Sequence, residues 1–245
     1  MILFLTSSPC DDHVPSHMHL PCCYFEKNDF VINLKKYWKQ NAKCLIISAA
    51  PRNFGLNNEM VYTFHRAFLY HGMIPEYVRV CDARNDYHIS DLVKESDMII
   101  LGGGHVPTQM DFFEKIGLRE LLKEYKGIVM GISAGSMNCA ETVYAQPEEA
   151  GESVDQDYRR FFPGLALTKY QILPHYQKVK DNILDGKRLY EDIIYQDSFH
   201  QRFYALPDSS YILQDKDGAV LYGEAYLVQD GKLTKICEDG ESVIL

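Results

Sequence analysis

The sequence lacks long apolar runs and any excess of positive charge. No apolar stretch approaches the 18 residues that a membrane-spanning helix needs, so we expect no transmembrane segment. Acidic residues outnumber basic ones by 34 to 25, and this balance disfavours nucleic acid, whose affinity depends on Lys and Arg. The opening "MILFLTSS" has no basic segment before its short apolar run, which argues against a secretory signal peptide. We therefore predict a cytoplasmic protein that binds neither nucleic acid nor membranes.

Signatures of nucleotide and metal binding are also scarce. The chain has neither GxGxxG nor the GK[ST] of a P-loop. Its seven cysteines are an odd, scattered set, which indicates free thiols. One segment, "PCDDHVPSHMHLPCCYF" (9–25), gathers possible zinc ligands, but the usual combination of a CxxC and an HxxxH pair is not cleanly present. Its ligand-type residues are Cys10, His13, His17, His19, Cys22 and Cys23. We interpret it as a surface loop rather than a metal site, and we predict no cofactor.

Apolar runs alternate with amphipathic segments along most of the chain, which indicates βαβ units. Most of the runs are continuous rather than alternating, as is typical of strands buried on both faces of a parallel sheet. They are "ILFLTS" (2–7), "KCLIISAA" (43–50), "YVRVCD" (77–82), "DMIILGG" (97–103), "GIVMGIS" (127–133) and "LALTKYQIL" (165–173). Helical composition fills 57–73 and 106–127 between them. We predict an α/β fold with an open, mainly parallel sheet and helices on both of its faces.

The last forty residues have a different pattern. Short β-type runs alternate there with Asp-Gly pairs at 217–218, 230–231 and 239–240, which favour tight hairpin turns. We predict an antiparallel β-meander attached to the main sheet. Because the sequence shows no internal repeat, low-complexity tract or linker, we expect residues 1–245 to form a single domain.

The motif "GISAGS" (131–136) places Ser133 between two glycines, after an apolar run and before a segment of small residues. A sharp strand-to-helix turn of this kind raises a serine hydroxyl above the C-terminal edge of a sheet, where open α/β sheets bind ligands. Gly131 and Gly135 prevent clashes at such a turn. We therefore predict that Ser133 is a nucleophile; the alternative is a tight turn with an incidental serine.

Two places in the sequence can supply the N–H groups that stabilise an oxyanion. The helix start after Ser133 would direct the N–H of Ala134 toward the developing charge. The triple glycine at 102–104 ends another predicted strand and would bring bare backbone close to a ligand. A phosphate-binding turn is the alternative for this cluster, but the motifs that accompany such turns are absent.

A serine nucleophile also needs a general base and a carboxylate that orients it. Of the nine histidines, His175 follows Pro174 where a predicted strand gives way to a loop, and we predict that it is the base. His105, after the glycines, is its rival. The acid stays open within the loop 146–157, and Glu148 is the first choice among its carboxylates. The loop's acidic residues are Glu148, Glu149, Glu152, Asp155 and Asp157, and a solvated acidic loop is the other interpretation.

These motifs together resemble the peptidase family that contains dipeptidase E (aspartyl dipeptidase) and cyanophycinase. The resemblance is carried by "FLTSS" (4–8), "LGGG" (101–104), "GISAGS" (131–136), "LPHY" (173–176) and "YALPDSSYI" (204–212). It implies a fold related to the class I glutamine amidotransferases and the activity of a serine hydrolase.

Residue by residue, the resemblance implies Ser133 as nucleophile, His175 as base, and an oxyanion hole of Ala134 with Gly103 or Gly104. The family's acid lies about fifteen to eighteen positions after its serine, a window that opens at Glu148 and Glu149. The chain departs from the family's pattern in three ways. His105-Val106 replace Asn-Thr, Ser136 replaces an alanine, and the Cys/His-rich loop has no counterpart. We expect the first and third departures to affect the substrate pocket, with His105 near the polar end of the substrate.

We accordingly predict a serine peptidase that cleaves small peptides, with N-terminal aspartyl residues implied by the resemblance. A buried substrate carboxylate needs a cation, and the candidates are Lys169, Lys178, Lys180, Lys187 and Arg188. An α/β-type esterase is one alternative, although such enzymes normally carry their histidine near the C-terminus, whereas 70 residues follow His175 here. A non-catalytic relative that binds a metabolite or a partner is another. We expect a monomer or a homodimer.

Overall fold

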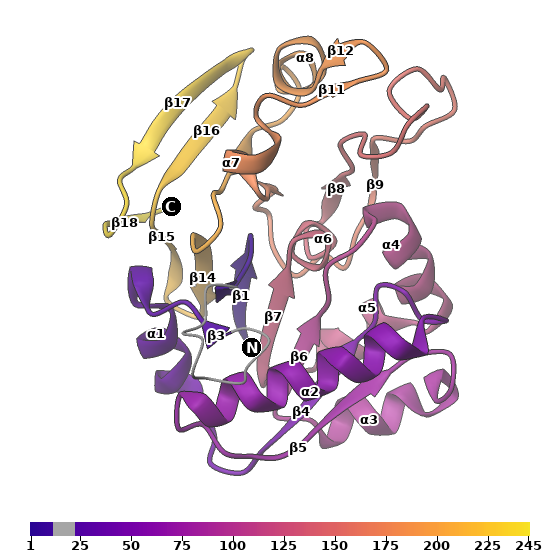
Figure 1. Ribbon diagram of the computed structural model, residues 1–245, viewed down its shortest axis with the longest axis vertical. Coiled ribbons are helices and arrows are strands. Elements are labelled where there is room, and N and C mark those ends of the chain that lie inside the picture. Colours follow the sequence, from indigo (N-terminus) through magenta and orange to yellow (C-terminus); the bar gives the residue numbers. More distant parts are fainter. Residues whose placement is uncertain (12–22) are drawn as a thin grey trace.

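The main sheet of the protein has eight strands, in the order β18-β15-β14-β1-β7-β6-β4-β5 (Figure 1). The computed structural model describes residues 1–11 and 23–245. Five neighbouring strands run parallel: β1 (Ile2–Thr6), β7 (Ile128–Ile132), β6 (Met98–Leu101), β4 (Ala42–Ile47) and β5 (Pro75–Cys81). Antiparallel strands extend the sheet beyond β1: β14 (Tyr211–Asp215), β15 (Gly218–Tyr222) and β18 (Ser242–Ile244). The prediction of an open, mainly parallel sheet is thus confirmed.

The parallel strands send alternate side chains into two apolar cores, one on each face of the sheet. In β6, Ile99 and Leu101 belong to one core, and Met98 and Ile100 belong to the other. Helices cover both faces. The elements α1 (Phe30–Tyr37) and α2 (Phe54–Tyr70) pack on the second core, and α3 (Ile89–Glu95), α4 (Val106–Lys115), α5 (Leu118–Lys123) and α6 (Ala134–Met137) pack on the first. Burial on both faces explains why β1, β4, β6 and β7 are mostly apolar runs, whereas β5, at the edge of the sheet, exposes Glu76 and Arg79.

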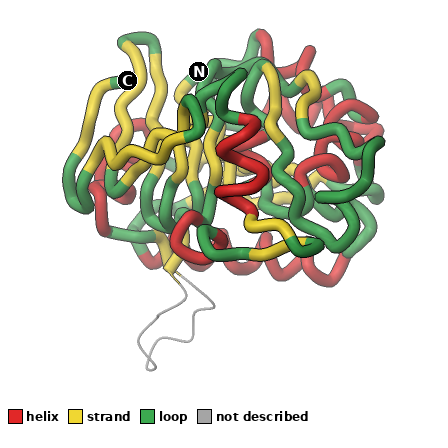
Figure 2. The backbone as a smooth tube through the Cα atoms, turned by 90° about the horizontal axis from the view of Figure 1, so that it is seen from above, coloured by secondary structure: helices red, strands yellow, loops and turns green. Residues whose placement is uncertain are grey.

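A second, four-stranded sheet follows the order β10-β13-β16-β17. Its strands are β10 (Ile172–Leu173), β13 (Phe203–Ala205), β16 (Ala225–Gln229) and β17 (Lys232–Cys237). The C-terminal strands are antiparallel, as predicted, but they are shared between two sheets: β14, β15 and β18 join the main sheet, whereas β16 and β17 join the second. Seen from above, the C-terminus lies among strands at one side of the molecule (Figure 2).

The remaining elements are short. They are β2 (Cys10–Asp11), β3 (Cys23–Tyr24), η1 (Lys27–Asp29), η2 (Asp86–His88), β8 (Thr142–Tyr144), β9 (Phe161–Pro163), α7 (Tyr176–Val179), β11 (Ile183–Leu184), β12 (Lys187–Arg188), η3 (Leu189–Ile194) and α8 (Tyr195–Asp197).

Two predicted elements differ from the observed ones. Only the last two residues of 165–173 form a strand. The N–H groups of Leu165 and Leu167 donate instead to the carbonyls of Asn138 and Cys139, just beyond α6, so they are not available to a sheet. The predicted helix 106–127 is divided into α4 and α5, because Gly117 adopts φ 65° between them.

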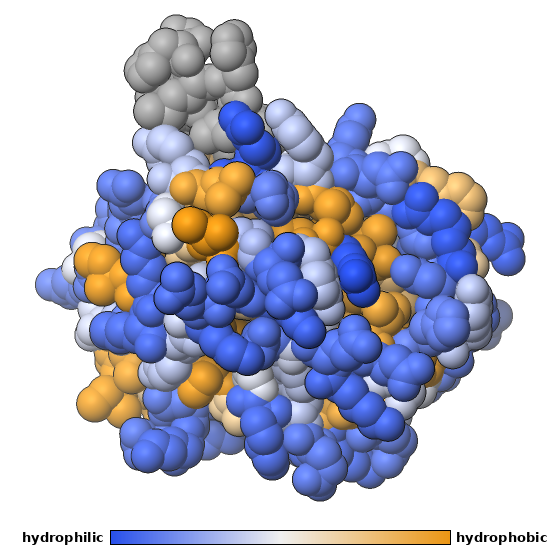
Figure 3. Space-filling model, turned by 90° about the horizontal axis from the view of Figure 1, so that it is seen from below, coloured by the Kyte–Doolittle hydropathy of each residue, from blue (hydrophilic) through white to orange (hydrophobic). Residues whose placement is uncertain are grey.

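The molecule shows no sign of a membrane-spanning helix within 1–11 and 23–245, where no helix combines the necessary length and apolar character. The face seen from below, opposite the tip of β7, is largely hydrophilic with separate hydrophobic patches (Figure 3). No group of three metal-ligating side chains occurs in the described part of the chain. His13, His17, His19 and Cys22 of the loop considered above lie outside the described residues.

Candidate active site

Ser133 lies at the turn between β7 and α6, at the C-terminal edge of the parallel strands. Its φ of 51° and ψ of −115° are rarely adopted by residues that carry a side chain. The flanking glycines make this turn sterically feasible. A Cβ on Gly131 would lie 2.6 Å from Cα of Ser136. A Cβ on Gly135 would overlap the carbonyl oxygen of Leu101. The turn therefore requires both glycines, and it holds the Ser133 side chain at the edge of the sheet.

His175 approaches Ser133 from the second sheet. It follows β10 and Pro174, and its left-handed backbone (φ 58°) begins α7. Nε2 of His175 lies 3.0 Å from Oγ of Ser133. The N–H of His175 donates to Oγ of Ser7, at 2.8 Å, just beyond the end of β1. The separation between imidazole and hydroxyl is that expected of a general base and its nucleophile.

Asp208, in the loop between β13 and β14, holds the other side of the imidazole. Its Oδ1 lies 2.6 Å from Nδ1 of His175 and accepts a hydrogen bond from Oγ of Ser7 at 2.9 Å. Its Oδ2 pairs with Nζ of Lys178 at 2.8 Å. Burial alone would raise the pKa of Asp208, but hydrogen bonds from His175, Lys178 and Ser7 outweigh burial and hold the pKa well below its usual range. The carboxylate is therefore ionised beside the imidazole.

This arrangement corrects the choice of Glu148 as the acid that orients His175. No hydrogen bond between described residues joins Glu148 to His175, because Asp208 occupies Nδ1. Sequence reasoning missed Asp208, although the residue lies within the "YALPDSSYI" segment. The available signal was a carboxylate directly after a β-type run, since such a position can lie at the same edge of a sheet as Ser133. Asp208 lies far beyond the window of about fifteen to eighteen positions after the serine, so that window could not include it.

Three backbone N–H groups lie near the turn, from Gly103, Gly104 and Ala134. None of them donates to a protein acceptor among the described residues. Gly103 adjoins Ser133 directly, because a Cβ on it would lie 3.5 Å from Cβ of Ser133. A Cβ on Gly104 would lie 2.7 Å from Cβ of Ala49, so this glycine is needed for close packing. The structure thus places Gly103 against Ser133, with Ala134 next to Ser133 in the chain, while Gly104 packs on Ala49.

His105 has a polar partner at each of its ring nitrogens. Its Nδ1 is 2.7 Å from Oγ1 of Thr108, and its Nε2 is 2.8 Å from Oε1 of Glu152. The other oxygen of Glu152 accepts the N–H groups of Glu148 (2.7 Å) and Glu149 (2.9 Å). His105 is therefore tied, through Glu152, to the loop after β8, which does not favour the predicted contact with substrate.

A cavity of about 310 Å³ lies beside Ser133 and His175. Its other lining residues are Gln146, Pro147, Glu148, Pro174, Val179, Asn182, Ile183, Leu184 and Leu189. A larger hollow, of about 710 Å³, lies at the opposite end of β1 and β7 and contains none of these residues. The cavity beside Ser133 is mostly apolar with one carboxylate, and it is where a substrate acyl group would fit.

The five cations considered for an acidic substrate do not line this cavity. Lys178 and Arg188 form ion pairs with aspartates, at 2.8 and 2.7 Å. Lys187 donates to a backbone carbonyl at 2.9 Å. Lys169 and Lys180 also lie outside the lining. The cavity therefore has no Lys or Arg from the described residues to neutralise a substrate carboxylate.

Comparisons with known proteins agree on one family and one fold. The model of Peptidase family S51 matches residues 26–222. A peptidase from an acI-B1 Actinobacterium superimposes with a TM-score of 0.67 at 15% identity, over 100% of this chain and 96% of that chain. A protein from Listeria monocytogenes EGD-e, named as a candidate peptidase E, gives a TM-score of 0.61 at 17% identity, over 90% and 96% of the two chains. No curated protein matches the sequence.

Proposed function

The chain belongs to peptidase family S51, and from this premise we propose that it is a serine peptidase acting on small peptides. The observation that carries the serine mechanism is the row of hydrogen bonds from Asp208 through His175 to Ser133. It ends at a sharp turn next to a cavity of about 310 Å³. A nucleophile, a base and an orienting carboxylate in this order are the arrangement that activates a serine hydroxyl.

In the acylation step, Oγ of Ser133 attacks the carbonyl carbon of the peptide bond, and Nε2 of His175 accepts the hydroxyl proton. Asp208 keeps the proton of the imidazole on Nδ1 and stabilises the imidazolium that forms. The carbonyl oxygen becomes an oxyanion, which the free N–H groups of Gly103 or Gly104 and of Ala134 stabilise. His175 then protonates the leaving amine, and an acyl-enzyme remains on Ser133.

In the deacylation step, a water molecule replaces the amine. His175 accepts one of its protons, and the hydroxide attacks the acyl carbon. A second oxyanion forms in the same position, so the same N–H groups stabilise it. Its collapse breaks the ester bond to Ser133, and the serine oxygen recovers its proton from His175. The product acid leaves the cavity.

The resemblance also implies a preference for N-terminal aspartyl peptides, and this preference stays a prediction, as does the cytoplasmic location expected from the sequence. The lining of the cavity offers no support for the aspartyl preference, since no lysine or arginine of the described residues reaches it. We therefore propose peptide hydrolysis itself as the function.

Labelling with a fluorophosphonate probe, followed by peptide mapping, tests the proposal. We expect the label on Ser133 and its loss in Ser133→Ala, while the matched variant Ser8→Ala still labels. Hydrolysis of a dipeptide panel should fall by several orders of magnitude in Ser133→Ala. Equal peptide turnover by the wild type and Ser133→Ala would refute the serine mechanism. Labelling without turnover of any peptide, but with turnover of simple esters, would favour the esterase alternative.

A further inference from the structure

The peptide unit between Gly102 and Gly103 is hydrogen-bonded on one side only. Gly102 is buried, and Nε2 of Gln109, in α4, donates to its carbonyl oxygen at 2.5 Å. The N–H of Gly103 belongs to the same planar unit and donates to no acceptor among the described residues. In a trans peptide the carbonyl and the N–H point in opposite directions. The N–H of Gly103 therefore points away from Gln109, which is fully buried, and Gly103 itself is exposed.

A second buried amide fixes the orientation of Gln109. Nδ2 of Asn138 donates to Oε1 of Gln109 at 2.9 Å and to the carbonyl oxygen of Val106 at 3.1 Å, and Asn138 is fully buried as well. A backbone carbonyl can only accept hydrogen bonds, so the carbonyls of Val106 and Gly102 decide which end of each side-chain amide carries the N–H groups. The two amides are thus held in one orientation, with the donor of Gln109 on Gly102.

The amide pair connects the nucleophile turn with the glycine loop. Asn138 ends the helix α6, which begins directly after Ser133, and its N–H donates to the carbonyl of Ala134 at 2.9 Å. Gln109 lies on α4, which packs against α6 (Figure 1). The loop that carries Gly103 is therefore positioned by the same helix that begins at Ser133.

Glycine on both sides makes this peptide unit easy to rotate, because no Cβ restricts its backbone angles. Two bonds of Gly102 prevent that rotation: its N–H donates to the carbonyl of Ile47, at the end of β4, at 3.1 Å, and its carbonyl accepts from Gln109. The next unit differs, since neither the carbonyl of Gly103 nor the N–H of Gly104 is hydrogen-bonded within the described parts of the chain. Oxyanion donors are most effective when they need no reorganisation during the reaction.

Resting on the proposed function, we propose that Gln109, held by Asn138, is a positioning residue for the oxyanion hole, and that it makes Gly103 rather than Gly104 the donor that acts with Ala134. Gln109 contacts no reacting atom. It fixes the peptide unit that presents the N–H of Gly103, and its own N–H polarises that unit, which strengthens Gly103 as a donor. Because the oxyanion forms only during the reaction, the contribution of Gln109 falls on kcat rather than on KM.

The choice between the two glycines can be tested on the wild type. The protein is labelled with ¹⁵N-glycine, and its amide spectrum is recorded before and after Ser133 reacts with a fluorophosphonate, whose phosphonyl oxygen occupies the position of the oxyanion. We expect the amide proton of Gly103 to move downfield, as a hydrogen bond to a charged oxygen requires, and that of Gly104 to move less. A downfield shift of Gly104 without one of Gly103 would overturn the inference.

The role of Gln109 is tested with Gln109→Met, which keeps the length of the side chain but cannot donate to Gly102. We expect kcat for the best-cleaved peptide of the panel to fall by roughly tenfold to a hundredfold, and KM to stay within about threefold. The rate at which the fluorophosphonate labels Ser133 should fall by a similar factor, since that reaction also places charge on an oxygen in the oxyanion hole. Asn138→Leu leaves Gln109 without its anchor and should give a smaller loss of the same kind.

Asn33→Leu is the matched control. It removes another buried amide, on α1 and on the other face of the sheet, whose Nδ2 donates to the hydroxyl of Tyr211 at 2.7 Å. We expect it to lower the urea midpoint of unfolding and to leave kcat of the folded protein unchanged. Wild-type kcat in folded Gln109→Met, a loss confined to KM, or a loss no larger than that of Asn33→Leu would each refute the role of Gln109.

If neither Gln109→Met nor Asn138→Leu folds, the amide spectrum of the wild type decides. The wild type also separates this inference from the proposed function. If it labels at Ser133 and cleaves peptides while the variants match it, this inference alone fails. If it neither labels nor cleaves, both fail.

Discussion

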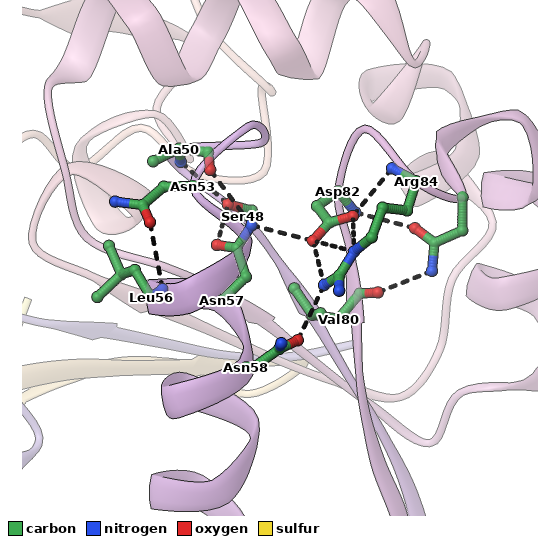
Figure 4. A network of polar contacts seen from close by, with 10 residues as sticks. Ser48, Ala50, Asn53, Leu56, Asn57, Asn58, Val80, Asp82 and Arg84 are labelled. Carbon is green, nitrogen blue, oxygen red and sulfur yellow. Dashed lines mark hydrogen bonds and ion pairs between the residues drawn. The ribbon is translucent and has the colours of Figure 1, made fainter.

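Two carboxylates near the C-terminal ends of the parallel strands have opposite surroundings. Asp82, directly after β5, is fully buried, and its Oδ2 accepts hydrogen bonds from Nη2 of Arg84 at 2.6 Å and from Nδ2 of Asn57 at 3.0 Å (Figure 4). Burial alone would raise the pKa of Asp82, but these bonds outweigh burial and lower it. Glu148, at the cavity, keeps solvent-exposed surface, and the protein around its carboxyl raises its pKa to about 7 because its partners compensate less.

The difference separates a structural carboxylate from one that is available to a ligand. Every partner of Asp82 comes from the neighbouring loop or from α2, so the network in Figure 4 stabilises the fold and leaves nothing for a ligand to supply. Asp208 has compensating partners as well, but one of them is His175, which accepts and returns the proton of Ser133 in the proposed reaction. Glu148 alone among the three has a raised pKa, and no lysine or arginine of the described residues lines its cavity. Perturbed groups of this kind cluster at functional sites.

Among variants of these carboxylates, Asp208→Asn is expected to have the largest effect on activity. The amide keeps the shape of the side chain but carries no negative charge. It therefore no longer holds the imidazole with its proton on Nδ1, and it does not stabilise the imidazolium that forms during the reaction. We expect kcat to fall by roughly 10³- to 10⁴-fold. The measurement is hydrolysis of the best substrate of the panel, with the urea midpoint of unfolding as control. A variant with wild-type activity would remove Asp208 from the proposed mechanism.

Asp82→Ala is expected to act on stability instead. It leaves Arg84 and Asn57 without their common acceptor, and we expect the free energy of unfolding to fall by about 2 kcal/mol, because one side of a buried pair is removed. Urea unfolding measures the loss, and kcat/KM under folding conditions should stay close to the wild-type value. A much larger loss of activity than of stability would show that the Asp82 network serves the reaction, and the comparison with Glu148 would then fail.

Local sequence patterns predicted the parts of the molecule that depend on neighbouring residues. The strands β1, β4, β6 and β7 were recognisable because burial on both faces requires apolar runs, and in β5 buried Val78 and Val80 flank exposed Arg79. The run 165–173 was misleading, since its apolar side chains are buried beside α6 while its N–H groups complete that helix end. Apolar composition reports burial, and it does not say which backbone partner a segment finds.

The sequence by itself determined the turn at Ser133, because the steric demand for Gly131 and Gly135 is local, and it indicated His175 through its position at the end of an apolar run. Only the tertiary structure decided that Asp208 rather than Glu148 meets Nδ1 of His175. The reason is physical: β10 and β13 pair in the second sheet, so His175 and Asp208 follow the same edge of that sheet, and no spacing along the chain encodes this pairing. The tertiary structure also placed Glu148 in the lining of the cavity beside Ser133, where no lysine or arginine of the described residues lies and its pKa is raised.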